Sequence, residues 1–270
     1  MVEVVPHLRH YDADYGNFKN ELYAEIRREA YGVDIGQSSW LTSDELDRVV
    51  QHLALSPSKV LLDVACGSGG PALRVAELTG CSIEGVDIHN DAIAAANSMV
   101  AERRLSARAH FQVGDAAARL PFPDASCDAI LCNDAINHLP DRKRVITEWS
   151  RLLKRGGRML FTDPITVTGP LTKPEIAIRS SIGFFLFVPP GYDAQVIAEC
   201  GLDLIACEDV TENMATVAER RRAARASHEA QLRKIEGDST YEGQQEFLTV
   251  ASRLAAERRL SRLLYVAEKK

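Results

Sequence analysis

The 270-residue chain is predicted to be an α/β protein with a doubly wound, mostly parallel, seven-stranded sheet. Short apolar segments alternate with amphipathic ones from residue 59 to residue 163, which is typical of parallel strands joined by crossover helices. A loop of small residues separates the first strand from the first crossover helix, and carboxylates follow the strands. Sheets of this class bind ligands at the carboxyl ends of their strands, so we expect the functional site there.

Residues 1–56 are expected to form a helical N-terminal lid. Apolar residues at helical spacing predict a helix over 16–30, and Thr42-Ser-Asp-Glu45 has the capping-box pattern that starts a second helix. This lid is rich in aromatic residues, most of which we expect to pack against the sheet domain. Tyr31 and Trp40 are candidates for contact with a ligand.

Residues 57–270 are expected to form the sheet domain. The predicted strands are 59–64, 82–87, 107–113, 127–132, 158–163, 203–208 and 263–267, and the predicted helices between them are 70–79, 90–104, 141–154 and 192–200. An apolar, proline-containing piece at 164–191 is expected to fold over the site as a cap insert. A helical insertion at 211–260 precedes the last strand. Within it, 212–236 predicts one long exposed helix, with Arg220-Arg-Arg222 on the solvated face.

The segment Val60-Leu-Leu-Asp63-Val-Ala65-Cys66-Gly67-Ser-Gly69-Gly70 predicts a strand, a glycine-rich turn and the start of a helix. Backbone N–H groups at such a turn approach a nucleotide-like ligand closely, at the positive end of the helix dipole. Asp87, about 20 residues after the glycines, is placed to accept hydrogen bonds from both ribose hydroxyls. This device is shared by dinucleotide enzymes and by enzymes that use S-adenosylmethionine (SAM).

The carboxylates favour SAM over a dinucleotide. Asp63 precedes the glycines, where it would repel a pyrophosphate but attract the ammonium of a methionine moiety. Asp115 follows the third strand, where it could accept a hydrogen bond from an adenine amino group. Several carboxylates suit a cofactor that is cationic at both its sulfur and its amine.

These motifs resemble class I SAM-dependent methyltransferases. Residues 60–70 are similar to motif I, Gly85-Val-Asp87-Ile88 to the acidic motif after it, and Gly114-Asp115-Ala116 with Leu120-Pro-Phe-Pro to motif II. Asn133-Asp134-Ala-Ile-Asn-His138 is similar to the sarcosine/dimethylglycine methyltransferase group of small-molecule enzymes. Ala65 stands in place of the usual first glycine, and Arg155 in place of the common proline before the double glycine.

The resemblance implies a Rossmann-like fold and transfer of a methyl group from SAM to an N, C or O atom of a small molecule, with S-adenosylhomocysteine as product. The residues it implies for the cofactor are Asp63, Ala65, Cys66, Gly67, Gly69, Asp87, Ile88, Asp115, Ala116 and Asn133. Catalytic candidates are His138, whose pKa suits a general base, and Asp134, four residues before it. Arg179, beside the apolar cap, is a candidate to bind a substrate carboxylate.

Composition limits the partners and the cellular location that we expect for the protein. The net charge of −6 disfavours nucleic acid as a partner, and the longest apolar run is too short to span a bilayer. Six scattered cysteines without a CxxC pair indicate reduced thiols in a cytoplasmic protein, and no metal site is expected. A macromolecular methyltransferase and a non-catalytic SAM-binding partner protein remain alternative functions. The sequence does not fix the oligomeric state, for which a homodimer is one alternative.

Overall fold

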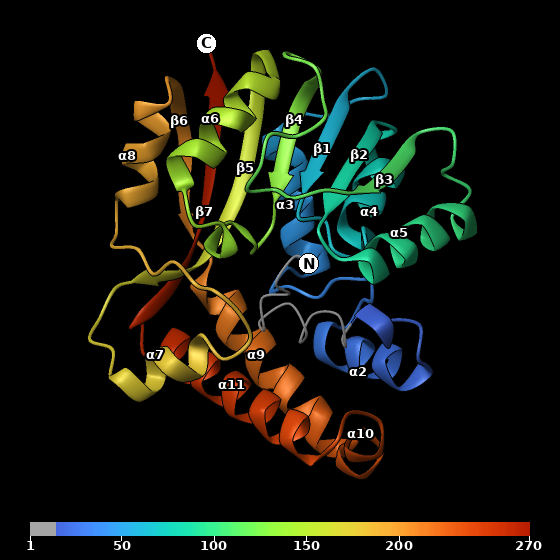
Figure 1. Cartoon of the computed structure of the whole chain (residues 1–270), viewed down its shortest axis with the longest axis vertical. Coiled ribbons are helices and arrows are strands. Elements are labelled where there is room, and N and C mark those ends of the chain that lie inside the picture. The colour runs from blue at the N-terminus through green and yellow to red at the C-terminus, as the bar shows by residue number, and fades with distance from the viewer. Residues whose placement is uncertain (1–14) are drawn as a thin grey trace, which may run out of the picture.

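The computed structural model describes residues 15–270 as a twisted sheet with helices on both faces (Figure 1). Its seven strands lie in the order β3-β2-β1-β4-β5-β7-β6, and β7 is antiparallel to both of its neighbours. The strands are β1 (Val60–Val64), β2 (Ser82–Asp87), β3 (Ala109–Val113), β4 (Cys127–Cys132), β5 (Leu153–Val167), β6 (Leu202–Asp209) and β7 (Leu260–Lys269). The predicted doubly wound, mostly parallel sheet is therefore confirmed.

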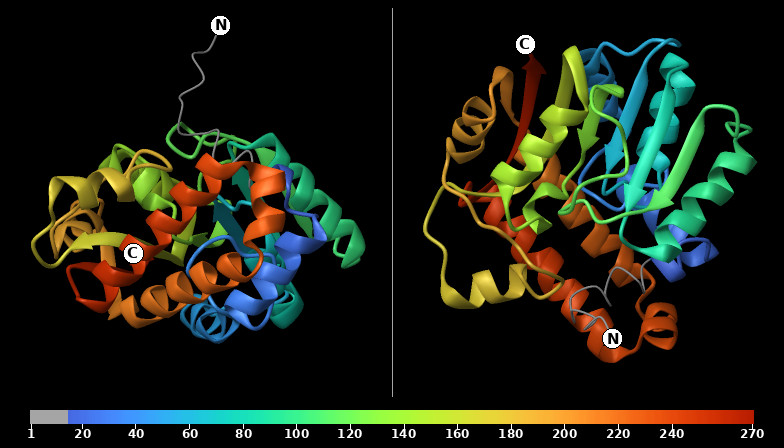
Figure 2. Two further views of the ribbon diagram at one scale, coloured as in Figure 1. Left: turned by 90° about the horizontal axis from the view of Figure 1, so that it is seen from below. Right: turned by 45° about the horizontal axis from the view of Figure 1, so that its top comes forward.

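The helices are α2 (Glu21–Tyr31), α3 (Ser43–Leu53), α4 (Gly70–Thr79), α5 (Asn90–Glu102), α6 (Arg142–Leu152), α7 (Lys173–Arg179), α8 (Tyr192–Glu199), α9 (Thr211–Ser227), α10 (Glu229–Glu236) and α11 (Asp238–Ala256). Apolar side chains of α3, α4 and α5 pack on one face of the sheet, and those of α6 and α8 on the other. The remaining helices gather at the end to which the parallel strands point (Figure 1). Figure 2 shows α9 and α11 side by side beneath those strand ends.

Several predicted boundaries differ from the observed ones. The helix predicted over 16–30 begins at Glu21, where Asn20 caps it. The long helix predicted over 212–236 is two helices, α9 and α10, divided at His228. Strand β5 runs to Val167, four residues past its predicted end, because its extension pairs with β7. The piece after it contains α7.

The pattern Thr42-Ser-Asp-Glu45 forms only half of the predicted capping box. The Thr42 hydroxyl accepts a hydrogen bond from the Glu45 backbone N–H. The Glu45 carboxylate does not return to the Thr42 backbone; it is buried and binds Arg262 of β7 instead. The complete capping box belongs to Thr172 and Glu175 at the start of α7.

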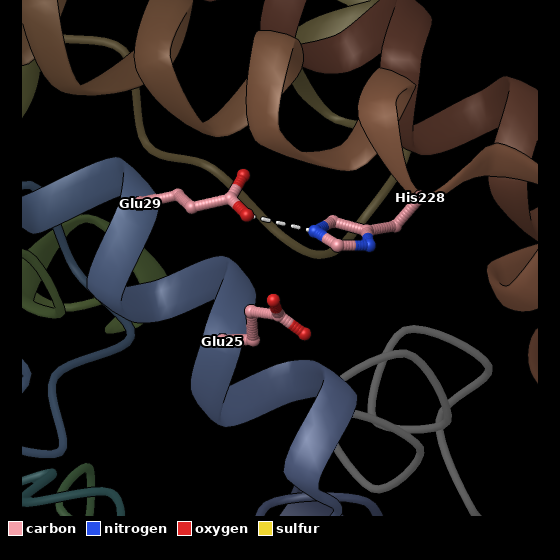
Figure 3. Close-up of side chains that lie close together, drawn as sticks. All are labelled: Glu25, Glu29 and His228. Atoms are coloured by element: carbon pink, nitrogen blue, oxygen red, sulfur yellow. Dashed lines mark hydrogen bonds and ion pairs between the residues drawn. The ribbon is translucent and has the colours of Figure 1, made fainter.

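The N-terminal helix α2 is attached to the helical layer by polar contacts. His228, between α9 and α10, lies 2.8 Å from the Glu29 carboxylate, and Figure 3 shows Glu25 one turn away on the same face of α2. The Tyr23 hydroxyl donates a hydrogen bond to Glu236 of α10. In the part of the chain that the structure describes, no helix is long and apolar enough to cross a membrane.

Candidate functional site

A cavity of about 260 Å³ lies at the carboxyl ends of β1, β2, β3 and β4. The loops that follow these four strands form its floor, as the fold class predicts. The segment 36–39, which precedes α3, and the cap residues Gly183 and Phe184 cover it. We call this the cofactor cavity.

The loop after β1 has the left-handed backbone that a glycine-rich turn requires. Its φ angles are 55° at Ala65, 54° at Gly67 and 76° at Gly69. A Cβ atom on Gly69 would meet the Phe111 ring at 2.8 Å, so this glycine permits the packing of the loop on the sheet. Ala65, Cys66 and Gly67 line the cavity, whereas Gly69 caps α4 behind it.

Carboxylates dominate the electrostatics of the cavity. Asp63 is 4% exposed, and no group within residues 15–270 gives its carboxylate a hydrogen bond or an ion pair. Burial and the neighbouring charge of Asp87 raise the pKa of Asp63 well above its usual value. Asp87 accepts hydrogen bonds from the Gly67 N–H at 2.8 Å and from the backbone and ring of His89. A cavity wall with such a carboxylate favours a cationic ligand.

The other predicted cofactor residues also line this cavity. Ile88 is 44% exposed in it, and Ala116 is buried beneath it. Asp115 accepts a hydrogen bond from the Ala117 N–H, so this acid also shapes its own turn. Asn133 donates a hydrogen bond to the Ser39 hydroxyl, which ties the end of β4 to the segment above it.

A smaller cavity of about 50 Å³ adjoins the cofactor cavity, and Ser38, Ser39, Asp134 and His138 line both. We call it the acceptor cavity. Its walls are aromatic and cationic, and they include Trp40, Asn137, Arg179, Ile182, Phe185, Arg221 and Phe247. Two predicted substrate residues, Trp40 and Arg179, are therefore brought to it. The third, Tyr31, lies outside both cavities and donates a hydrogen bond to the Ser39 carbonyl at 2.6 Å.

The imidazole of His138 is held in one tautomer by a contact with the cap. It ends the 3₁₀ turn Ile136–His138, and its Nδ1 lies 2.8 Å from the Phe184 carbonyl of the cap. A carbonyl only accepts hydrogen bonds, so Nδ1 carries the proton and the lone pair is on Nε2. Burial lowers the pKa of His138 to about 4, which keeps the ring neutral near pH 7.

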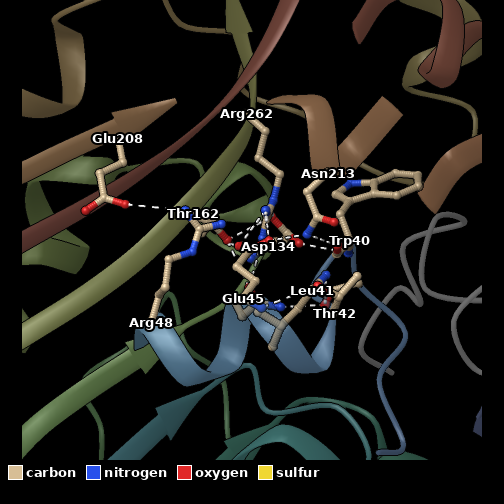
Figure 4. A network of polar contacts seen from close by, with 12 residues as sticks. Trp40, Leu41, Thr42, Glu45, Arg48, Asp134, Thr162, Glu208, Asn213 and Arg262 are labelled. Carbon is tan, nitrogen blue, oxygen red and sulfur yellow. Dashed lines mark hydrogen bonds and ion pairs between the residues drawn. The ribbon is translucent and has the colours of Figure 1, made fainter. Parts of the chain in front are cut away.

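Asp134, the other catalytic candidate, is engaged in a buried polar network (Figure 4). Its carboxylate accepts hydrogen bonds from Arg262 Nε at 2.6 Å, from the Thr162 hydroxyl at 2.8 Å and from the Trp40 backbone N–H at 2.9 Å. Arg262 Nη1 also donates to both oxygens of Glu45. Asp134 therefore positions Trp40 and the strand end, and its carboxylate does not hydrogen-bond to His138.

Some of the lining residues lie outside the sequence prediction. Segment 36–39 contributes its backbone and two serines, and only its position between two predicted helices could have marked it. Arg221 was assigned to a solvated face, yet its guanidinium stacks over the Trp40 ring at 5.5 Å in the acceptor cavity. Its helical spacing from the buried Val217 and Ala218 was the available signal. Conversely, Asp163, at the predicted end of the strand that β5 extends, lines neither cavity and pairs with the buried Arg142.

Comparisons with known proteins show the family of the chain. The family model described as "Methyltransferase domain" matches residues 62–161. The 27-O-demethylrifamycin SV methyltransferase of Amycolatopsis mediterranei is 30% identical over 208 residues, which cover 75% of this chain and 75% of that protein. The sarcosine/dimethylglycine N-methyltransferase of Halorhodospira halochloris is 28% identical over 179 residues, 64% of this chain and 63% of that protein.

Among solved structures, a phosphoethanolamine N-methyltransferase of Haemonchus contortus in complex with phosphomonomethylethanolamine and S-adenosylhomocysteine has the same fold. The TM-score is 0.79 at 19% identity, and the match covers 96% of this chain and 60% of that one. The motifs at the strand ends, the cavity above them and the first of these relatives lead to one conclusion. The chain belongs to the class I SAM-dependent methyltransferases.

Proposed function

We propose that the protein transfers the methyl group of SAM to a hydroxyl oxygen of a small, largely apolar molecule. The observation that carries this proposal is the neutral His138, which lines both cavities with its lone pair on Nε2. A hydroxyl is protonated at neutral pH, so its methylation is the case that gains most from a general base. The relative named for an O-demethylated substrate supports the same assignment.

The charge of the cofactor cavity and its place at the strand ends support SAM as its ligand. In this proposal Asp63 accepts hydrogen bonds from the ammonium group, Asp87 from the ribose hydroxyls and Asp115 from the adenine amino group. Residues 65–67 lie along the cofactor between these contacts. The buried Asp63 carboxylate, which has no cationic partner among residues 15–270, is what an ammonium would neutralise. Bound SAM supplies a methyl group on a sulfonium, whose S–C bond breaks as the O–C bond forms.

The residues of the chain then orient the acceptor and accept its proton. Trp40, Phe185 and Phe247 give the acceptor cavity apolar walls that exclude water, and Arg179 and Arg221 favour oxygen-rich or anionic groups there. His138 accepts the hydroxyl proton at Nε2, and its Nδ1 contact with the Phe184 carbonyl keeps the ring in the required tautomer. Asp134 acts through Trp40 as a positioning residue.

The test is the variant His138→Gln, which keeps a hydrogen-bonding side chain but cannot take up a proton. We expect kcat to fall about 10²- to 10⁴-fold, with the Kd for SAM unchanged. Transfer of tritium from methyl-labelled SAM into a small-molecule extract measures the rate, and calorimetry measures the Kd. Label entering protein or RNA, or a rate unchanged by the substitution, would overturn the proposal.

An amine acceptor is the second candidate, because a relative is named for N-methylation of sarcosine and dimethylglycine. A neutral amine attacks without a base, so an amine acceptor would leave His138→Gln nearly fully active. The non-catalytic SAM-binding alternative predicts SAM binding without transfer of label in any extract.

The proposal includes a cytoplasmic enzyme that works without nucleic acid, supported by the free cysteines and the net charge of −6. A homodimer would be tested first at the edge strand β6, where Leu204 and Ile205 are 40% and 50% exposed.

A further inference from the structure

The side chain of Asn137 is buried in the acceptor cavity without hydrogen bonds. It is 0% exposed, and no group within residues 15–270 hydrogen-bonds to its Nδ2 or its Oδ1. Nearly all buried amides in folded proteins are paired, because leaving donors and an acceptor unpaired costs free energy. An orphaned amide in a cavity wall is therefore a group adapted to something other than the protein.

The backbone around Asn137 fixes this amide in place. Asn137 lies in the middle of the 3₁₀ turn that ends at His138, and its carbonyl accepts a hydrogen bond from the Leu186 N–H of the cap at 2.8 Å. His138 Nδ1 contacts the same cap two residues earlier, at the Phe184 carbonyl. The turn and the cap are thus bonded on two sides, which places the amide and the imidazole as neighbours on one rigid element.

The location of Asn137 distinguishes an acceptor contact from a cofactor contact. Asn137 lines the acceptor cavity together with His138, Arg179 and Phe247, but it is not among the residues that line the cofactor cavity. Its amide is therefore on the side of His138 where the proposed function places the methyl acceptor, and this inference rests on that function.

We propose that Asn137 is a specificity residue that hydrogen-bonds a second oxygen of the acceptor, next to the hydroxyl that is methylated. An amide both donates and accepts, so it matches a neighbouring hydroxyl or carbonyl and not a bare hydrocarbon. Since Asn137 and His138 line the same small cavity, the two oxygens are close together. The acceptor class is then a vicinal diol or hydroxy-ketone on an apolar ring, for which the aromatic walls offer apolar contacts.

The first experiment measures the stability of Asn137→Leu without ligands. Leucine has a similar size and carries no unpaired polar atoms, so we expect the Tm to rise by about 2 to 4 °C. The matched control is Asn213→Leu, because the Asn213 amide donates to the Trp40 carbonyl and to Glu45, and its loss lowers the Tm. A fall of the Tm in Asn137→Leu like that of the control would show a structural role and overturn the inference.

The second experiment uses two probes that differ by one oxygen, 2,3-dihydroxynaphthalene and 2-naphthol, titrated by NMR into the protein saturated with S-adenosylhomocysteine. The wild type should bind the diol about tenfold more tightly, and Asn137→Leu should bind the two equally. A wild type without preference for the diol, or a preference that survives in Asn137→Leu, overturns the inference. Failure of the wild type to bind S-adenosylhomocysteine would instead overturn the proposed function.

Discussion

Two buried polar regions of this molecule meet at Asp134 and are built in opposite ways. In the network around Arg262, a fully buried guanidinium donates to Glu45 and to Asp134, and each carboxylate has further donors (Figure 4). In the cavity wall beside it, the Asp63 carboxylate and the Asn137 amide receive no hydrogen bond from any residue within 15–270. Asp134 and Asn137, one from each region, are only three residues apart in the sequence after β4.

Under the proposed function, the difference separates groups that stabilise the fold from groups that bind a ligand. Charges that the protein itself neutralises stabilise one arrangement of the lid, and removing one partner leaves the other buried and unpaired. Buried charges that the protein leaves unneutralised lower its stability, and such groups are typical of sites that bind a ligand of opposite charge. Substitutions in the two regions should therefore have opposite signatures, in stability for one and in affinity for the other.

The largest effect is expected at Arg262. Arg262→Met should lower the free energy of unfolding by about 3–5 kcal/mol, because Glu45 and Asp134 would remain buried without their counter-ion. Urea denaturation measures the change. The control is Arg48→Met in α3, since Arg48 is 53% exposed and lies 3.9 Å from Glu208; its loss should cost less than about 1 kcal/mol. Equal effects of the two substitutions would erase the distinction between the regions.

At Asp63 the effect should be on affinity. We expect Asp63→Asn to weaken SAM binding about 10- to 100-fold, without loss of stability, because it removes the partner of the ammonium group and also an uncompensated buried charge. Calorimetry with 5′-methylthioadenosine, which lacks the amino-acid part of SAM, provides the control. Its affinity should not change, and an equal loss for both ligands would show that Asp63 only shapes the loop.

The pH dependence of SAM binding should follow the same carboxyl group. Burial and Asp87 raise the pKa of Asp63 in the ligand-free cavity, and a bound cation lowers it again. When the pH is below the raised pKa, the Asp63 carboxyl group must lose its proton before SAM binds. The affinity for SAM should therefore fall by up to about tenfold per pH unit as the pH decreases through that pKa. The slope should disappear in Asp63→Asn. A slope that persists in this variant would assign the titration to another group.

The smallest effect is expected at the pair of His228 and Glu29 shown in Figure 3, whose side chains are 15% and 41% exposed. The carboxylate raises the pKa of His228, so the stabilisation is present below the unfolded value of about 6.5 and is lost as the pH rises through the folded value. His228→Gln should cost less than about 1 kcal/mol at pH 6 and nothing at pH 9, measured by thermal unfolding. A larger cost, or one that persists at pH 9, would mean that solvent exposure does not explain the contrast with Arg262.

The parts of the fold that a local sequence pattern determines were predictable from sequence. Strands β1, β2 and β4 and helix α4 lie within a residue of their predicted positions, because apolar runs and a glycine-rich turn leave few alternatives. The carboxylates that follow β1, β2 and β3 were predictable for the same reason, since parallel strands end at one edge. That edge is where the cofactor cavity lies.

The acceptor cavity was less predictable because its walls come from segments far apart in the sequence. Arg221 belongs to α9 and Trp40 to the segment before α3, and only the packing of α9 against α2 and α11 brings them together. The role of Asp134 was obscured in a similar way, because its partner Arg262 lies 128 residues later. A pattern within one segment cannot reveal a partner in another.

The position of β7 has a consequence for the order of events during synthesis. Strand β7 lies between β5 and β6, yet it follows β6 in sequence by three helices of about 50 residues. At roughly 5 to 20 residues per second, β6 waits several seconds for β7 to leave the ribosome. Asp134 and Glu45 wait longer for Arg262, because they precede it by 128 and 217 residues. During that interval the nascent chain presents an open sheet edge and two uncompensated carboxylates, the state in which a chaperone would recognise it.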